Sequence, residues 1–244
     1  MVNWFETLAA RSELSAEAAS ELHHQGFTVL PGPVPSERME SLTNAYTAAM
    51  SSASGPDVRV GSTSTRVSDF VNRGRDFDAL YIFPPLLDAC CRVIGQPFKL
   101  SSLQARTLRP HTPAQELHVD VRRDSTDWPL LGFILMIDAF RPENGATRFV
   151  PGSHQWLSAP EGTTSDLRAD RTGQVLAYGP PGSLLIFNGS AWHGHTANTS
   201  DAPRRSLHGA FIPRAGQAAT DFAARMQPDT RARLSALARH VLAA

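Results

Sequence analysis

The 244-residue chain is 41% hydrophobic and 19% charged, with 23 basic (Lys and Arg) and 23 acidic residues and a formal net charge of zero. This composition supports a buried core and excludes an intrinsically disordered chain. A neutral chain offers no broad basic surface, so we expect neither nucleic acid nor a membrane as a partner. Residues 1–20 contain no apolar run, so we expect no signal peptide there, and the adjacent Cys90 and Cys91 are expected to stay reduced. Both expectations favour a cytoplasmic location.

Helical signals dominate the first hundred residues. A helix capped by Ser15 is expected to end at Gly26, because serine is a preferred N-cap and glycine a preferred helix stop. Residues 51–64, rich in serine and glycine, predict a mobile loop. The other expected elements here are a strand over Phe27–Leu30 and helices over Ser36–Met50 and Pro85–Ile94.

From Phe98 onward, short apolar and β-branched runs alternate with turn residues, as in a β-sandwich or barrel. The expected strands lie within Leu131–Phe140, Thr147–Val150, Val175–Tyr178, Leu184–Phe187 and Leu207–Ile212. We therefore predict a mainly β fold with flanking α-helices in a single domain, 1–244. Its expected parts are a helical segment at about 1–97, a β-barrel core at about 98–213 and a C-terminal helix at about 216–242.

Three side chains predict a metal site. In an extended strand, residues i and i+2 point to the same face, so His118 and Asp120 can ligate one ion together. The third ligand is expected from Trp192-His193-Gly194. Two histidines and one carboxylate leave three coordination positions open, an arrangement typical of non-haem iron(II) oxygenases. His195 competes with His193, because two residues further along a strand it would share the same face.

A basic side chain is expected beside this metal. Residues 197–203 are rich in turn formers, and a hairpin there would bring Arg204 back to His193, 11 residues earlier. Iron(II) with one aspartate carries a net charge of +1. A dicarboxylate such as 2-oxoglutarate and one arginine then bring the sum to zero, and a guanidinium can grip a carboxylate through two hydrogen bonds. Arg205 would face the opposite way on the strand.

Three segments resemble the phytanoyl-CoA dioxygenase family of iron(II)/2-oxoglutarate oxygenases. They are Gln115-Glu-Leu-His-Val-Asp120, Asn144-Gly-Ala-Thr-Arg-Phe-Val-Pro-Gly-Ser-His154, and Trp192-His-Gly followed by Asn198-Thr-Ser-Asp-Ala-Pro-Arg-Arg205. The opening Gln25-Gly-Phe-Thr-Val-Leu-Pro-Gly32 is similar to that family's usual start. The segments occur in the family's order and span most of the chain, and the second is the most specific.

The resemblance implies a double-stranded β-helix (jelly roll, cupin-like) that uses iron(II), 2-oxoglutarate and O2. It implies that His118, Asp120 and His193 hold the iron and that Arg204 binds the distal carboxylate of 2-oxoglutarate. Two further residues, Thr147 and Gln104, match positions that line the co-substrate pocket in the family. Related halogenases lack the carboxylate, so the presence of Asp120 favours hydroxylation or a related oxidation.

The expected function is a dioxygenase that oxidises an unactivated C–H bond of a small molecule in natural-product metabolism. Arg122 and Trp192 are candidate substrate contacts. A charged loop is the more common role for a residue such as Arg122, and a position in the core is an equal alternative for Trp192. Specificity is expected to come from residues 51–80, 121–130 and 155–175. Two other classes stay open, a non-catalytic jelly-roll binding protein and a zinc hydrolase on a cupin-like barrel, and the chain can be a monomer or a homodimer.

Overall fold

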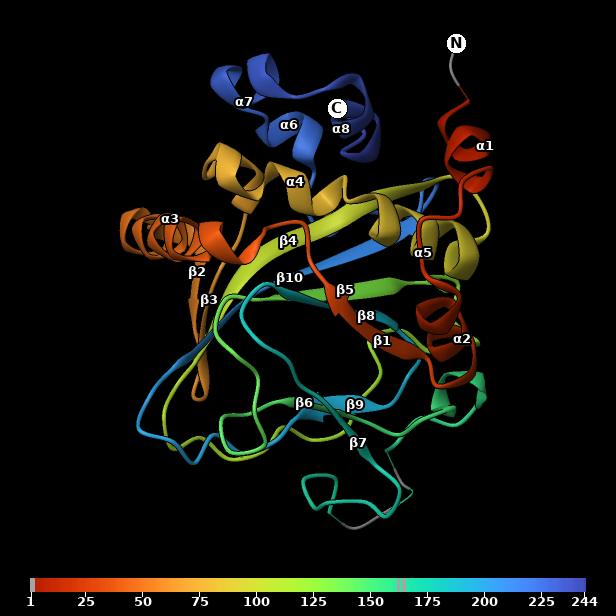
Figure 1. Ribbon diagram of the computed structural model, residues 1–244, viewed down its shortest axis with the longest axis vertical. Coiled ribbons are helices and arrows are strands. Elements are labelled where there is room, and N and C mark those ends of the chain that lie inside the picture. Colours follow the sequence, from red (N-terminus) through yellow and green to blue (C-terminus); the bar gives the residue numbers. More distant parts are fainter. Residues whose placement is uncertain (1–2, 162, 164–165) are drawn as a thin grey trace.

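Two antiparallel sheets form the body of the protein (Figure 1). The computed structural model describes residues 3–161, 163 and 166–244. The larger sheet has the strand order β1-β8-β5-β10-β4-β3-β2, and the smaller has the order β7-β6-β9. The strands are β1 Phe27–Pro31, β2 Val58–Val60, β3 Ser64–Val67, β4 Phe98–Leu108, β5 Leu131–Met136, β6 Thr147–Phe149, β7 Val175–Ala177, β8 Ser183–Asn188, β9 His193–His195 and β10 Arg204–Pro213.

The helices gather on the side of the larger sheet that faces away from the smaller one (Figure 1). They are α1 Trp4–Ala9, α2 Ala16–His24, α3 Met39–Ser52, α4 Asp78–Tyr81, α5 Pro84–Ile94, α6 Phe222–Arg225, α7 Pro228–Arg233 and α8 Ala236–Val241. Within the described part of the chain, none of them combines the length and apolar character that crossing a membrane requires.

The central strands β5 and β8 of the larger sheet are buried on both faces, because helices cover one face and the smaller sheet packs against the other. Side chains alternate between these two faces along each strand. On β5, Phe133 and Leu135 join a core that includes the buried face of α5, whereas Ile134 and Met136 join a second core between the sheets. Phe149 of the smaller sheet packs into this second core. The apolar strands β1, β8 and β5 therefore fix the spacing between the two sheets at one end.

Several sequence predictions for local structure are confirmed. The Ser15 side chain accepts a hydrogen bond from the Ala18 amide, which caps α2 as expected. The helix predicted over Pro85–Ile94 is α5, which begins at Pro84, one residue before the predicted start, with proline in its first turn. Cys90 and Cys91 are both free thiols.

Other predictions need correction. The expected loop at 51–64 contains the short strand β2, and its last residue begins β3. Both strands extend the larger sheet at one edge. The part predicted as helical, 1–97, therefore contributes three strands to this sheet, β1, β2 and β3. The expected C-terminal helix at 216–242 is instead three short helices, α6 to α8. Pro228 and the caps Asp221 and Ser235 begin these helices, so the local signals divide the segment.

The hairpin expected between β9 and β10 is absent from the described strands. β9 pairs with β6 in the smaller sheet, whereas β10 lies between β4 and β5 in the larger one. The chain between them crosses from one sheet to the other, and Asn198 anchors it by donating hydrogen bonds to the carbonyls of Arg109 and Ala202. His193 and Arg204 consequently approach from opposite walls of the fold.

Candidate active site

The two sheets enclose a cavity of about 480 Å³. β4 and β10 of the larger sheet line one wall with polar side chains, and the opposite wall comes from β6, β9 and the segment 115–120. A surface cleft of about 600 Å³ lies near Tyr46, but the charged pair beside it, Arg205 and Asp138, is already joined by hydrogen bonds. The cavity between the sheets, in contrast, is lined by Arg66, Arg106 and Arg204, none of which forms an ion pair with an acidic residue in the described part of the chain.

The backbone places His118 and His193 side by side. Each amide donates to the other's carbonyl, with N···O distances of 2.9 and 3.0 Å, and the imidazole centroids are 4.4 Å apart. The segment around His118 is a single β-bridge rather than the expected strand. Two residues later the backbone has left this bridge, and the Asp120 amide donates to the Gly189 carbonyl. Even so, the predicted i, i+2 arrangement holds for the side chains.

The three side chains converge on one point. Asp120 Oδ1 lies 3.9 Å from His118 Nε2 and 3.8 Å from His193 Nε2. One ligand atom from each residue lies within 4.8 Å of the other two, a spacing that suits a single metal ion. His195 is outside this group of three, although it lines the same cavity and its Nδ1 donates to the Thr196 carbonyl.

Hydrogen bonds prepare both imidazoles for a metal. His118 Nδ1 lies 3.0 Å from the Glu116 carbonyl, and His193 Nδ1 lies 2.9 Å from the Ala191 carbonyl. A carbonyl only accepts, so each Nδ1 carries the proton and each Nε2 keeps its lone pair. Phe149 stacks on the His193 ring with the centroids 5.5 Å apart, which holds that ring in place.

The metal-free protein is expected to lose stability in mild acid. Burial, followed by the charge of His193, lowers the pKa of His118 to about 4, and burial followed by the charge of Arg106 lowers the pKa of His195 to about 3. Both values lie below the usual 6.5, so the unfolded chain binds more protons between pH 6.5 and 4. This stability is complete above pH 6.5 and is lost as the pH falls toward 4.

Urea unfolding at pH 7.5 and pH 5.0 measures this loss. Replacing His195 by asparagine should flatten the dependence, because this side chain then no longer titrates. Equal unfolding midpoints at the two pH values would contradict the expectation.

Arg204 is a buried cation without an acidic partner. The side chain is 1% exposed, and among the described residues neither Nε nor Nη1 has a hydrogen-bond partner. Its guanidinium carbon lies 3.9 Å from the centre of the Phe140 ring, and burial lowers its pKa to about 9. A desolvated guanidinium of this kind is costly unless an anion joins it, so the donor set fits a carboxylate that enters the cavity.

The cavity also holds the two side chains expected to line the co-substrate pocket. Thr147 lies on β6, opposite His195, and Gln104 lies on β4, opposite His208. Arg205 faces away, as strand alternation predicts, and pairs with Asp138.

The two candidate substrate contacts lie elsewhere. Arg122 is an exposed loop residue that pairs with Asp124, and it is not among the cavity's lining residues. Trp192 is buried against Trp156, and its indole donates to the Ser158 carbonyl, so it serves the core. Of the expected specificity segments, 51–80 and 121–130 reach the cavity through Arg66 and Leu130. The third segment, 155–175, includes residues 162 and 164–165, which lie outside the described residues.

Sequence reasoning missed several cavity residues, above all Arg106 and Arg66. Arg106 on β4 is 9% exposed, and it has no acidic partner among the described residues. Gln104 and Arg106 are two residues apart on β4 and therefore point to the same face, so predicting a strand there would have found Arg106.

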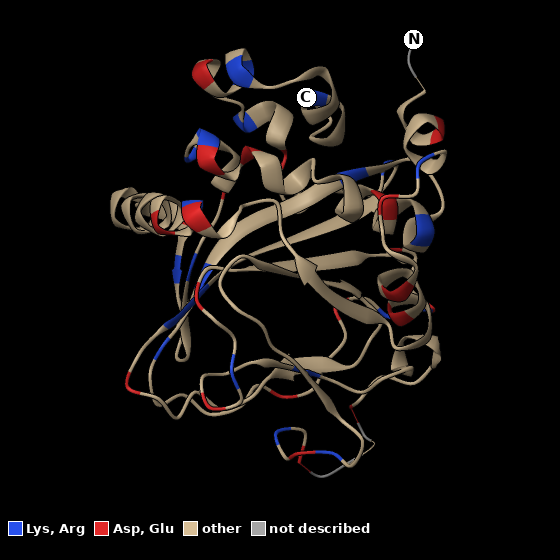
Figure 2. Cartoon of the chain, in the orientation of Figure 1, with Lys and Arg blue, Asp and Glu red and all other residues tan. Residues whose placement is uncertain are grey.

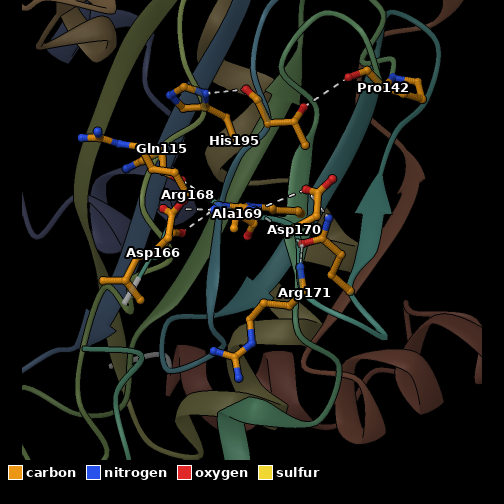
Figure 3. A network of polar contacts seen from close by, with 12 residues as sticks. Gln115, Pro142, Asp166, Arg168, Ala169, Asp170, Arg171 and His195 are labelled. Carbon is orange, nitrogen blue, oxygen red and sulfur yellow. Dashed lines mark hydrogen bonds and ion pairs between the residues drawn. The ribbon is translucent and has the colours of Figure 1, made fainter. Parts of the chain in front are cut away.

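Arg148 ties a surface loop to the metal-site segment. This fully buried side chain, from the Asn144–His154 motif, donates to the backbone carbonyls of Gln115, Leu167 and Ala169 at 2.7–3.0 Å. Figure 3 shows the network around Gln115, Asp170 and His195. The Leu117 amide also donates to the Leu167 carbonyl, so the loop braces the backbone next to His118.

Replacing Arg148 by methionine is expected to lower the free energy of unfolding by about 2–4 kcal/mol, because three carbonyls lose their charged donor inside the protein. Chemical denaturation measures this loss, and Arg168→Met is the matched control. Arg168 belongs to the same loop but pairs with Glu116 at the surface, so that change should stay within about 0.5 kcal/mol. Equal losses in the two variants would show that Arg148 has no special structural role.

The arrangement defines a class, namely a jelly-roll protein whose cavity presents a two-histidine, one-carboxylate triad opposite a buried arginine. The family model described as "Phytanoyl-CoA dioxygenase (PhyH)" matches residues 22–206. The chain belongs to this family, which confirms the resemblance seen in the sequence.

Two relatives are dioxygenases by name. Dioxygenase cdmA of Talaromyces verruculosus is 36% identical over 108 residues, which are 41% of this chain and 35% of that protein. Dioxygenase trt7 of Aspergillus terreus is 38% identical over 114 residues, which are 43% of this chain and 38% of that protein. The matched part thus spans well under half the length of either relative.

A solved structure shares the fold. HygX from Streptomyces hygroscopicus, with nickel and 2-oxoglutarate bound, superimposes with a TM-score of 0.67 at 19% identity, covering 85% of this chain and 90% of that one. A further HygX structure also holds hygromycin B and superimposes with a TM-score of 0.66 at 17% identity, covering 84% of this chain and 90% of that one. The predicted mainly β jelly roll with flanking helices is thereby confirmed as the fold of this chain.

Proposed function

We propose that the protein is an iron(II)- and 2-oxoglutarate-dependent dioxygenase that oxidises a C–H bond of a small molecule. The observation that carries the proposal is Arg204, a buried guanidinium without an acidic partner among the described residues, which faces the same cavity as the triad. The triad alone suits any divalent metal. A triad together with a desolvated cation suits a metal that also binds a dicarboxylate from solution, because the cation can bind the carboxylate that is not on the metal.

Each residue has a role that follows from its surroundings. His118, Asp120 and His193 would hold iron(II) on one face and leave the other face open to the cavity. Arg204 would bind the distal carboxylate of 2-oxoglutarate through two hydrogen bonds. Bound iron would supply the activation of O2, coupled to the oxidative decarboxylation of 2-oxoglutarate to succinate and carbon dioxide.

Thr147 and Gln104 would orient the co-substrate from opposite walls of the cavity. The apolar side chains of Phe187 and Ile134 line the cavity as well, and they would limit the access of water to the reacting atoms. The presence of Asp120 favours hydroxylation over halogenation, because the carboxylate takes the position that a halide would need.

The direct test is a pair of measurements on the purified protein. Anaerobic addition of iron(II) and 2-oxoglutarate should produce a visible charge-transfer band, and exposure to O2 should then release succinate in a reaction that needs both additions. A non-catalytic jelly-roll binding protein would bind one or both and release no succinate. Release that is independent of iron would contradict the proposal.

A further inference from the structure

Three arginines lie directly opposite one another on adjacent strands at one edge of the larger sheet. Arg59 on β2 pairs with Arg66 on β3, and Arg66 pairs with Arg106 on β4. We call these three residues the arginine row. Figure 2 shows basic positions gathered on these neighbouring strands. Like charges at directly opposed positions destabilise a sheet, so the row does not contribute to the stability of the fold. Its presence therefore points to a role in function.

The row leads from the protein surface into the cavity. Arg59 is exposed and lines a groove outside, half-buried Arg66 lines both that groove and the cavity, and buried Arg106 lines the cavity. No ion pair joins any of the three to an acidic residue in the described part of the chain.

Arg106 is the innermost and least satisfied member. Its Nε is buried without a hydrogen-bond partner, and Nη2 lies at the limit of hydrogen bonding to Gln115 Oε1, at 3.5 Å. Burial, followed by the charge of Arg66, lowers the pKa of Arg106 to about 10. The charge of Arg106 also acts on His118, His195 and Arg204, which places it within the electrostatic reach of the whole site.

The cavity's charges do not balance with the co-substrate alone. Its lining holds Arg66, Arg106 and Arg204 against Asp120, a net charge of +2. Iron(II) raises this to +4, and 2-oxoglutarate returns it to +2. Arg204 suffices to balance the metal, its aspartate and the co-substrate, so the two remaining cations are in excess. Desolvated cations in excess favour an additional anion.

We infer that the arginine row recognises an anionic oxygen group of the substrate, a carboxylate or a phosphate, and seats it at Arg106. This inference rests on the proposed function, since it assigns the substrate class of the same site. Arg59 and Arg66 draw the anion toward the cavity, and the unpartnered Nε of Arg106 donates to it. Arg106 lines the same cavity as His118, Asp120 and His193, so an anion held at Arg106 keeps the rest of the substrate inside the cavity that the triad faces.

Binding of simple probes tests the inference. Hexanoate, hexyl phosphate and the neutral hexanamide are titrated calorimetrically into protein loaded with iron(II) and 2-oxoglutarate under argon. At least one of the two anions should bind about tenfold or more tightly than hexanamide, and the stronger of them identifies the group. Arg106→Gln should weaken that binding by about tenfold to a hundredfold, the loss expected for one charged hydrogen bond. Arg75→Gln, an exposed arginine outside the row, should not.

Three results would overturn the inference. The first is equal binding of hexanamide and both anions. The second is loss of the 2-oxoglutarate charge-transfer band in Arg106→Gln, which would assign Arg106 to the co-substrate. The third comes from Arg66→Gln, which should not lower the melting temperature because it relieves cross-strand repulsion. A lower melting temperature with unchanged probe affinity would make the row structural.

Two measurements on the wild-type protein distinguish a failure of this inference from a failure of the proposed function, namely the charge-transfer band and the binding of the probes. A wild-type protein that forms no charge-transfer band would contradict the proposed function. The probe titrations can also be repeated on the wild-type protein and on Arg106→Gln without metal. If an anionic probe then bound more tightly than hexanamide to the wild type but not to Arg106→Gln, the role of the arginine row in anion binding would still be supported.

Discussion

Replacing Asp120 by alanine is expected to abolish iron-dependent succinate formation. Asp120 is the only carboxylate of the triad, and its Oδ1 lies within 3.9 Å of both imidazole Nε2 atoms. Loss of a group that merely orients a metal ligand costs about 10–100-fold in metal affinity or activity, so loss of a ligand itself should exceed 100-fold. The measurements are bound iron after desalting and the rate of succinate release.

Two controls sharpen this experiment. Asp124→Ala removes a nearby but exposed carboxylate that pairs with Arg122, and it should retain iron and activity. His193→Ala should behave like Asp120→Ala, whereas His195→Ala should keep the iron, because only His193 lies in the triad. Iron retained by His193→Ala and lost by His195→Ala would show that the structure's pairing of His118 with His193 does not define the metal site.

Replacing Arg204 by methionine should separate ligand binding from stability. A buried charge pair that loses one member typically costs about 2–5 kcal/mol, so the Kd for 2-oxoglutarate should rise about 30-fold or more. Without ligand, however, the variant should unfold less readily than the wild type, by about 1 kcal/mol or more, because a desolvated cation is replaced by an apolar side chain of similar size. Titration of the charge-transfer band and chemical denaturation measure the two effects.

Arg205→Met is the matched control, and it should differ from Arg204→Met in both measurements. Arg205 is the next residue along β10 but faces outward and pairs with Asp138 at 2.7 Å. Its loss should lower the free energy of unfolding by about 1 kcal/mol and leave 2-oxoglutarate affinity unchanged. If both variants weakened 2-oxoglutarate binding equally, Arg204 would not be the residue that holds the co-substrate.

The arginine row connects these results to specificity. Arg204 and Arg106 lie on neighbouring strands and face the same cavity, yet we assign them different anions. The charge count requires two separate partners, because one dicarboxylate balances only the iron, Asp120 and one arginine. The two variants therefore test two independent predictions. Arg204→Met is tested by the affinity for 2-oxoglutarate, and Arg106→Gln is tested by the affinity for the probe anions.

Local signals in the sequence determined much of the fold. The Ser15 cap and the proline at the start of α5 are decided by backbone chemistry within one turn, so they can be found without a structure. The i, i+2 spacing of His118 and Asp120 also predicted that their side chains point the same way, although the segment is a single β-bridge and the Asp120 amide bonds the distant Gly189 carbonyl. The family motifs led to the jelly roll and to Arg204 for the same reason, since each is a short contiguous segment.

Tertiary structure decided what depends on pairing between distant segments. Whether His193 or His195 joins His118 is a matter of register, and the backbone bridge between His118 and His193 settles which side chains meet. The expected hairpin before Arg204 was wrong because β9 and β10 belong to different sheets, and only packing between sheets determines that. The arginine row likewise depends on strand pairing. Arg59 and Arg66 meet across two consecutive strands, whereas Arg66 and Arg106, 40 residues apart, become neighbours only because β3 pairs with β4.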